Sequence, residues 1–142
     1  MHTIGEAIKI VQSIVPQTLT NNNGDTSGES IVDTKGYDSA AFVILAGNGT
    51  FVDETYSFQV RESDNSDGTS SSAITGAVSA ITADNQVKKI QVSGLGTGTR
   101  KRYMFVRGSL AGSNESLPCT AFAILARATG ILSPAQAPDV SV

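Results

Sequence analysis

The sequence predicts an all-β fold, an antiparallel β-sandwich or jelly roll of about eight strands. Three observations support this fold class. Several segments alternate apolar and polar residues with a period of two, two further segments are apolar almost throughout, and turn-forming residues separate the segments at short intervals. No helical stripe of comparable length lies between the segments, so a sheet built from β-α-β units is not expected.

The alternation is clearest in residues 56–63, where Tyr56 and Phe58 point to one face and Ser57 and Gln59 point to the other. Segments rich in Gly, Asn, Asp and Ser supply the turns between such runs. In chain order, the predicted strands cover residues 17–20, 30–33, 40–46, 56–63, 73–81, 87–95, 101–108 and 120–128.

Two of these runs, 40–46 and 120–128, contain almost no polar side chain. Such runs fit either strands that are buried on both faces or the central strands of a sandwich. Cys119 opens the second run, and we expect it to be a small buried hydrophobe.

The two ends of the chain differ from the middle. Residues 1–16 place Ile4 and several later apolar residues at helical spacing, but the β-branched run that starts at Ile8 favours an extended arm or strand. Pro16 is expected to end either element. We therefore predict an arm or strand over 1–16, a β-sandwich domain over 17–131, and an extended tail over 132–142.

Composition and charge exclude several classes of protein. Only 16% of the 142 residues are charged and the net charge is −3, which is unlike the basic surface of a nucleic-acid-binding protein. One cysteine permits no internal disulfide, and no segment resembles a signal peptide or a membrane span. We expect no nucleic-acid or membrane partner, and synthesis and assembly in a cytoplasm.

The residues of catalytic and metal sites are scarce. His2 is the only histidine, so neither a zinc site nor a Ser-His-Asp or Cys-His relay is expected. The loop from Asp64 to Gly68 resembles a calcium loop, but the twelfth position is Thr75; a solvated hairpin loop is the alternative. The glycines of 94–98 lead into a strand and not into a helix, unlike a phosphate loop. We predict no enzymatic activity, no cofactor and no metal.

Arg100, Lys101 and Arg102 form the strongest basic cluster. They can pair within the chain, for example with Asp53 and Glu54, or contact an acidic partner protein. A nucleic-acid contact is the third alternative, and three residues on an acidic chain are weak support for it.

Four segments, taken in order, resemble a known group of proteins. They are residues 31–40, which lead into an apolar strand, then 59–64, then 101–107, and finally the Ala-rich 121–126. This order is similar to that in the head cement, or decoration, proteins of tailed bacteriophages, which are small jelly-roll structural proteins encoded among the head genes. The resemblance covers roughly residues 8 to 138.

The resemblance implies a virion protein that binds the assembled capsid from outside and stabilises it. Its partners would be the major capsid protein and further copies of itself, as a homodimer or homotrimer. The alternative is a carbohydrate- or receptor-binding jelly roll of a phage tail or fibre, with Tyr37, Phe51 and Tyr103 as the loop-adjacent aromatic residues. The residues that we expect to contact a partner are Ile4, Ile8, Ile10, Arg100, Lys101, Arg102, Leu132, Pro134 and Pro138.

Overall fold

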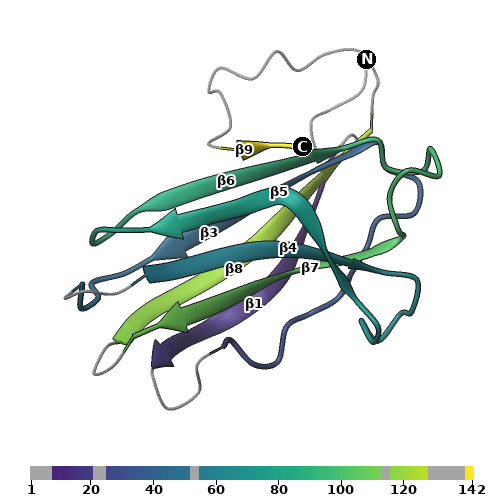
Figure 1. The fold of residues 1–142 in the computed structure, drawn as a ribbon. Coiled ribbons are helices and arrows are strands. Elements are labelled where there is room, and N and C mark those ends of the chain that lie inside the picture. Colours follow the sequence, from purple (N-terminus) through teal and green to yellow (C-terminus); the bar gives the residue numbers. More distant parts are fainter. Residues whose placement is uncertain (1–7, 21–24, 52–54, 113–115, 128–139) are drawn as a thin grey trace.

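The computed structural model describes residues 8–20, 25–51, 55–112, 116–127 and 140–142. These residues form strands, turns and loops and contain no helix. Two sheets pack face to face as layers (Figure 1). The strands are β1 (Ile8–Thr20), β2 (Val32–Asp33), β3 (Ser39–Ala46), β4 (Thr55–Ser63), β5 (Ser72–Ile81), β6 (Val87–Ser93), β7 (Tyr103–Ala111), β8 (Ser116–Ala126) and β9 (Val140–Ser141).

One sheet has the order β1-β8-β3-β6-β9 and the other the order β2-β7-β4-β5. Neighbouring strands are antiparallel throughout, except that the short β9 runs parallel to β6. The predicted all-β, two-sheet antiparallel class is therefore confirmed for the described residues. The runs predicted over 40–46 and 120–128 correspond to β3 and β8, which are interior strands of the larger sheet. Cys119 lies within β8 and does not open it, because this strand begins at Ser116.

The prediction that Pro16 ends an element is wrong. β1 is a single strand of 13 residues that continues through Pro16 to Thr20. Its pairing with β8 shifts between Gln12 and Ile14 and again between Ile14 and Gln17. A proline lacks the N–H of a regular ladder, but an edge strand with such irregularities accommodates it. Residues 8–15, which allowed a helix or a strand, are thus extended.

The core fills the space between the inner faces of the two sheets. In β3 the side chains alternate strictly between half-buried and buried positions, as expected for a strand with one face on the core. The largest fully buried side chains come from both layers: Tyr56, Phe42, Phe58, Ile14, Leu19, Ile44, Ile74, Ile81, Ile90, Met104, Leu117 and Leu125. Burial of these apolar groups is the main force that holds the layers together.

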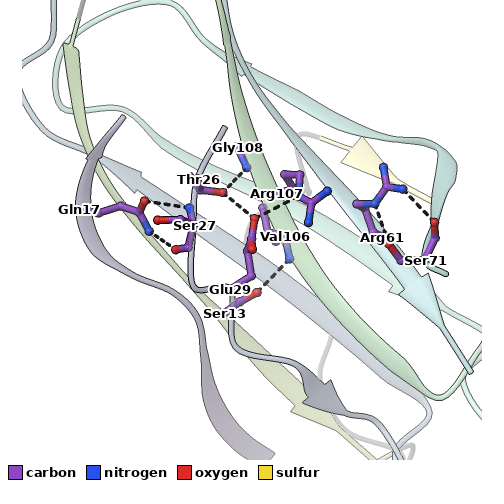
Figure 2. Close-up of polar contacts among 10 residues, drawn as sticks. All are labelled: Ser13, Gln17, Thr26, Ser27, Glu29, Arg61, Ser71, Val106, Arg107 and Gly108. Atoms are coloured by element: carbon purple, nitrogen blue, oxygen red, sulfur yellow. Dashed lines mark hydrogen bonds and ion pairs between the residues drawn. The ribbon is translucent and has the colours of Figure 1, made fainter. Parts of the chain in front are cut away.

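The segment 25–30 closes the side of the sandwich next to β1 and β7 (Figure 2). The N–H of Thr26 donates to the carbonyl of Gly108 at 2.8 Å, and the N–H of Gly108 donates to Thr26 Oγ1 at 3.0 Å. Ser13, which is fully buried in β1, accepts the N–H of Val106 on its hydroxyl at 2.9 Å. The bond between Ser13 and Val106 ties β1 of one sheet to β7 of the other, and the two bonds of Thr26 tie the 25–30 segment to β7.

Gly108 is required by this packing. A Cβ atom at this position would lie 2.6 Å from the ring of Phe58 and 3.0 Å from Cγ2 of Thr26. The absence of a side chain lets both the aromatic ring of Phe58 and the 25–30 segment approach β7 closely at this position.

Candidate protein-binding face

The outer face of the larger sheet is apolar where an antiparallel sheet usually carries polar residues. In β8, Phe122 and Ile124 alternate with the buried Ala121, Ala123 and Leu125 and therefore point away from the core. The register places Val43 of β3 opposite Phe122, and Ala41 opposite Ile124. Including β1 and β6, the apolar residues of this face are Ile8, Ile10, Ala41, Val43, Leu45, Val87, Phe122, Ile124 and Ala126.

Two of these side chains are largely exposed, Ile10 at 64% and Val87 at 60%. They mark opposite sides of the face, on β1 and β6. Polar side chains enter from all four strands: Lys89 and Gln91 of β6 lie opposite Val43 and Ala41, and the face also carries Gln12 of β1, Ser39 of β3 and Thr120 of β8. We call this surface, from β1 to β6, the β1–β6 face.

The charge of this sheet has one sign. Its strands contain no Asp or Glu, and their only charged residues are Lys9, Lys88 and Lys89. The chain as a whole has a net charge of −3. The acidic residues of the chain therefore lie outside the strands of this sheet. A partner surface that carries carboxylates would be attracted to the lysines of the sheet.

Two grooves hollow the β1–β6 face. The larger, about 430 Å³, lies where Pro16–Thr18 of β1 meet Pro118–Thr120 of β8 and Leu45–Gly47. The smaller, about 270 Å³, lies at the other end, between Ile8, Ile124 and Lys89. Both are open to solvent and mainly apolar in their lining, which suits protruding side chains of a protein partner better than an enclosed small molecule.

The outer face of the smaller sheet carries several polar side chains that are paired within the chain, beside the exposed Val78 of β5. Arg107 of β7 donates from Nε to Glu29 Oε1 at 3.1 Å, and Arg61 of β4 donates to the hydroxyl and carbonyl oxygens of Ser71 (Figure 2). Gln59 Nε2 donates to the carbonyls of Ile74 and Ala77, across an irregularity in the β4–β5 pairing. This face is typical of a solvated surface, in contrast to the β1–β6 face.

The sheet edges carry features that oppose edge-to-edge association. The free edge of β1 has Lys9, Pro16 and two register shifts, and β5 has a register shift near Gly76, whose φ is +81°. The remaining edge strands, β2 and β9, have two residues each. Association through a face is therefore favoured over the addition of strands from another chain.

The basic cluster is paired within the chain. Arg102 holds Asp33 in a bidentate pair, with Nε–Oδ1 at 2.8 Å and Nη2–Oδ2 at 2.6 Å. Lys101 lies 3.2 Å from Asp64, and Arg100 lies 3.9 Å from Glu62. The suggested partners Asp53 and Glu54 lie outside the described residues. Sequence reasoning missed the actual partners, which come from β2, β4 and the loop after β4, because their proximity depends on the pairing of these strands with β7.

The acidic loop after β4 is organised by its own hydrogen bonds. Asp67 Oδ1 accepts the N–H of Thr69 at 3.0 Å and its hydroxyl at 2.8 Å, and these bonds lower the pKa of Asp67. Asn65 donates to Thr69, and Asp64 turns to Lys101. This is the hairpin loop with Asx-type bonds that was the alternative to a calcium loop. No group of three or more possible metal-ligating side chains occurs in the described part of the chain.

The other predicted contact residues divide into two groups. Ile8 and Ile10 lie on the β1–β6 face, next to the strands that sequence analysis identified as apolar. Ile4, Leu132, Pro134 and Pro138 lie outside the described residues. The outward-facing residues of β3 and β8 were not predicted as contacts, although the lack of polar residues in both runs was a signal for them.

No helix of the described residues is long and apolar enough to cross a membrane. Comparison of the chain with protein-family models, curated proteins and solved structures gives no match.

Proposed function

We propose that this protein is a virion structural protein that binds an assembled phage capsid and stabilises the head. The β1–β6 face carries the proposal, because Phe122, Ile124 and Val43 present an apolar surface that water solvates poorly. The resemblance to head cement proteins supports the same partner, the major capsid protein. Binding would place the protein on the capsid exterior after assembly in the bacterial cytoplasm, without catalysis and without a cofactor.

We further propose that the sandwich is a jelly roll. The support is the order of pairing: the first strand pairs with the eighth, the second with the seventh, the third with the sixth and the fourth with the fifth. The additional pairs β8–β3 and β7–β4 join these hairpin-like pairs into two sheets. A long two-stranded ribbon that is wound into two layers has this order, and viral capsid proteins use the same fold.

The size of the β1–β6 face argues for binding through several copies. The part of the face where all four strands are paired is about seven residues long, and strands spaced about 4.8 Å apart cover roughly 400 Å² of flat area there. A stable interface buries about 800 Å² on each partner, so one face alone gives weak binding. We propose that a homodimer or homotrimer contacts the lattice through several faces at once, which raises the overall affinity by avidity.

The aromatic residues favour lattice binding over the alternative, a carbohydrate- or receptor-binding module. A sugar site needs exposed aromatic rings, but the three rings near loops have partners in the chain. Phe51 packs edge-to-face on Tyr56 at 5.5 Å between centroids, Arg102 lies over Tyr103 at 4.9 Å, and Arg127 lies over Tyr37 at 5.3 Å. Each of the two guanidinium groups covers one face of its ring, on which a sugar could otherwise stack.

The test is to mix the purified protein with expanded, undecorated shells of the phage that encodes it. We expect saturable binding and a higher temperature of shell disruption, because a ligand that binds only the assembled state stabilises that state. The absence of both binding and heat stabilisation would refute the proposed function. A glycan array probed with the same protein tests the alternative function, because a carbohydrate-binding module should bind specific glycans on it.

A further inference from the structure

A small cationic cavity lies where the turn after β2 meets the loop before β7. Its volume is about 200 Å³, and it is lined by Thr34, Lys35, Gly36, Gly96, Arg100 and Arg102. The two segments are held together because Thr34 donates to the carbonyl of Arg102 both from its N–H, at 3.0 Å, and from its hydroxyl, at 2.7 Å. Residues 68 positions apart thus form one site, which we call the Arg100 cavity.

The positive charges of the Arg100 cavity are only partly neutralised. The guanidinium of Arg102 donates two short hydrogen bonds to the carboxylate of Asp33, which neutralises its charge. Arg100 is 3.9 Å from Glu62 Oε1, which is too long for a hydrogen bond, while Glu62 Oε2 accepts the backbone N–H of Lys101 at 3.1 Å.

The hydrogen-bonding capacity of Arg100 is not satisfied by the described chain. Its Nε is buried and has no acceptor among the described residues. A buried donor without an acceptor is costly, and because Nε is closed to solvent, an anion in the cavity would contact the terminal nitrogens of this guanidinium. Lys35 is exposed and makes no ion pair with any residue that the structure describes.

We propose that the Arg100 cavity binds an oxyanion of the phosphate type, with Arg100 and Lys35 as its ligands. A guanidinium offers a planar fork of donors that matches two oxygens of such an anion, and an ammonium adds a point charge. Glu62 already lies 3.9 Å from Arg100, and the remaining positive charge attracts a dianion more strongly than it attracts a carboxylate. None of the residues that line the cavity belongs to the β1–β6 face, so the inference does not depend on the proposed function.

Glycines keep the backbone of the cavity open to an anion. Gly36 and Gly96 have φ of +85° and +75°, a region that disfavours other residues. A Cβ atom on Gly96 would meet nothing within 4 Å, and on Gly36 it would meet only the end of the Arg127 side chain, at 3.9 Å. Space next to both backbone segments is therefore available to the ligand.

The test is an NMR titration of the full chain with inorganic phosphate, with sodium chloride used to keep the ionic strength constant. We expect saturable shifts confined to the amides of Gly36 and Gly96 and to Nε of Arg100, with a Kd in the millimolar range. Parallel titrations with sulfate and acetate should rank acetate weakest. Methyl phosphate and dimethyl phosphate distinguish a free or terminal phosphate from a phosphodiester, since only the first keeps two charges. Shifts that do not saturate, or acetate binding as tight as phosphate, would overturn the proposal.

Variants separate a built site from general attraction. Arg100→Gln or Lys35→Gln should raise the Kd for phosphate about tenfold or more, the loss expected for one charge-assisted hydrogen bond. Lys101→Gln is the matched control: it removes the same charge one residue away, but Lys101 pairs with Asp64 and does not line the cavity. It should change the Kd less than about twofold. Equal effects of Lys101→Gln and Arg100→Gln would contradict the site. Lys35→Gln, at an exposed position, keeps the test valid if Arg100→Gln fails to fold.

Discussion

Ile10 of β1 lies directly opposite Ile124 of β8, and both side chains point outward from the larger sheet. Directly opposed residues of antiparallel strands share one face, so the pair extends the apolar surface from the interior of the sheet to its edge. Ile10 remains 64% exposed despite this neighbour. An exposed apolar surface such as the β1–β6 face is typical of a site at which another protein binds and removes the surface from water.

The two faces of the larger sheet should respond differently to the same truncation. Phe42 of β3 is fully buried in the core, whereas Phe122 of β8 is half-buried on the outer face. Phe42→Ala should lower the free energy of unfolding by about 3–5 kcal/mol, because it leaves a cavity. Phe122→Ala should lower the free energy of unfolding by clearly less, because this side chain is only half-buried. Urea denaturation of both variants measures this difference, and equal losses would show that the outer face is as well packed as the core.

Ser13 should contribute to stability through its buried hydroxyl. Ser13→Ala removes the acceptor of the Val106 N–H and leaves that donor buried, at a cost of about 1–3 kcal/mol. Ser57→Ala is the control: its hydroxyl pairs with that of Ser109 at 2.9 Å on the outer face of the smaller sheet, where water can replace it. Thermal unfolding should show a larger decrease for Ser13→Ala, and the reverse order would contradict the assigned role.

The Asp33–Arg102 pair should make stability depend on pH in acid. Hydrogen bonding from Arg102 lowers the pKa of Asp33 from 3.8 to about 2. Because the folded pKa is below the unfolded value, the stabilisation is present above about pH 4 and is lost as the pH falls towards 2. Both side chains are 45% exposed, so the contribution is below ~1 kcal/mol.

The check on this pair is the slope of unfolding free energy between pH 4 and pH 2. Asp33→Asn should make this slope shallower, and Arg102→Gln should have the same effect. The double variant should have the same slope as either single variant, because both changes remove the same interaction. Additive effects would mean that the two residues act independently.

Cys119 should be an unreactive thiol. Burial raises its pKa to about 11, and only 5% of the residue is exposed. At pH 8 its reaction with a disulfide reagent should be roughly a hundredfold or more slower in the native protein than in denaturant, because the thiolate is the reacting form. Similar rates in both conditions would contradict the burial of this side chain.

The strands with strict patterns could be predicted from the sequence. The predictions for 40–46, 56–63 and 87–95 correspond closely to β3, β4 and β6, since alternation and turn residues are local signals. Pro16 misled the prediction for β1, because the register shifts that accommodate a proline depend on the partner strand β8.

The candidate site was less accessible to sequence analysis. The apolar runs of β3 and β8 were compatible with burial on both faces and with central strands of a sandwich. Only the sheet order reveals that no described element packs on the outer face of these two strands. Likewise, the pairing of Arg102 with Asp33 depends on the contact between β2 and β7, which no local pattern encodes.

The most direct test of the β1–β6 face compares two exposed valine or isoleucine positions on edge strands of the two sheets. Ile10 lies on the β1–β6 face, and Val78, 42% exposed, lies on β5 of the smaller sheet. Co-sedimentation with expanded, undecorated shells measures the affinity of Ile10→Glu and Val78→Glu, after matched unfolding curves for both. We expect Ile10→Glu to weaken binding at least about tenfold and Val78→Glu to bind like the unmodified protein. Loss of binding in Val78→Glu with retention in Ile10→Glu would contradict the assignment of the β1–β6 face as the contact surface.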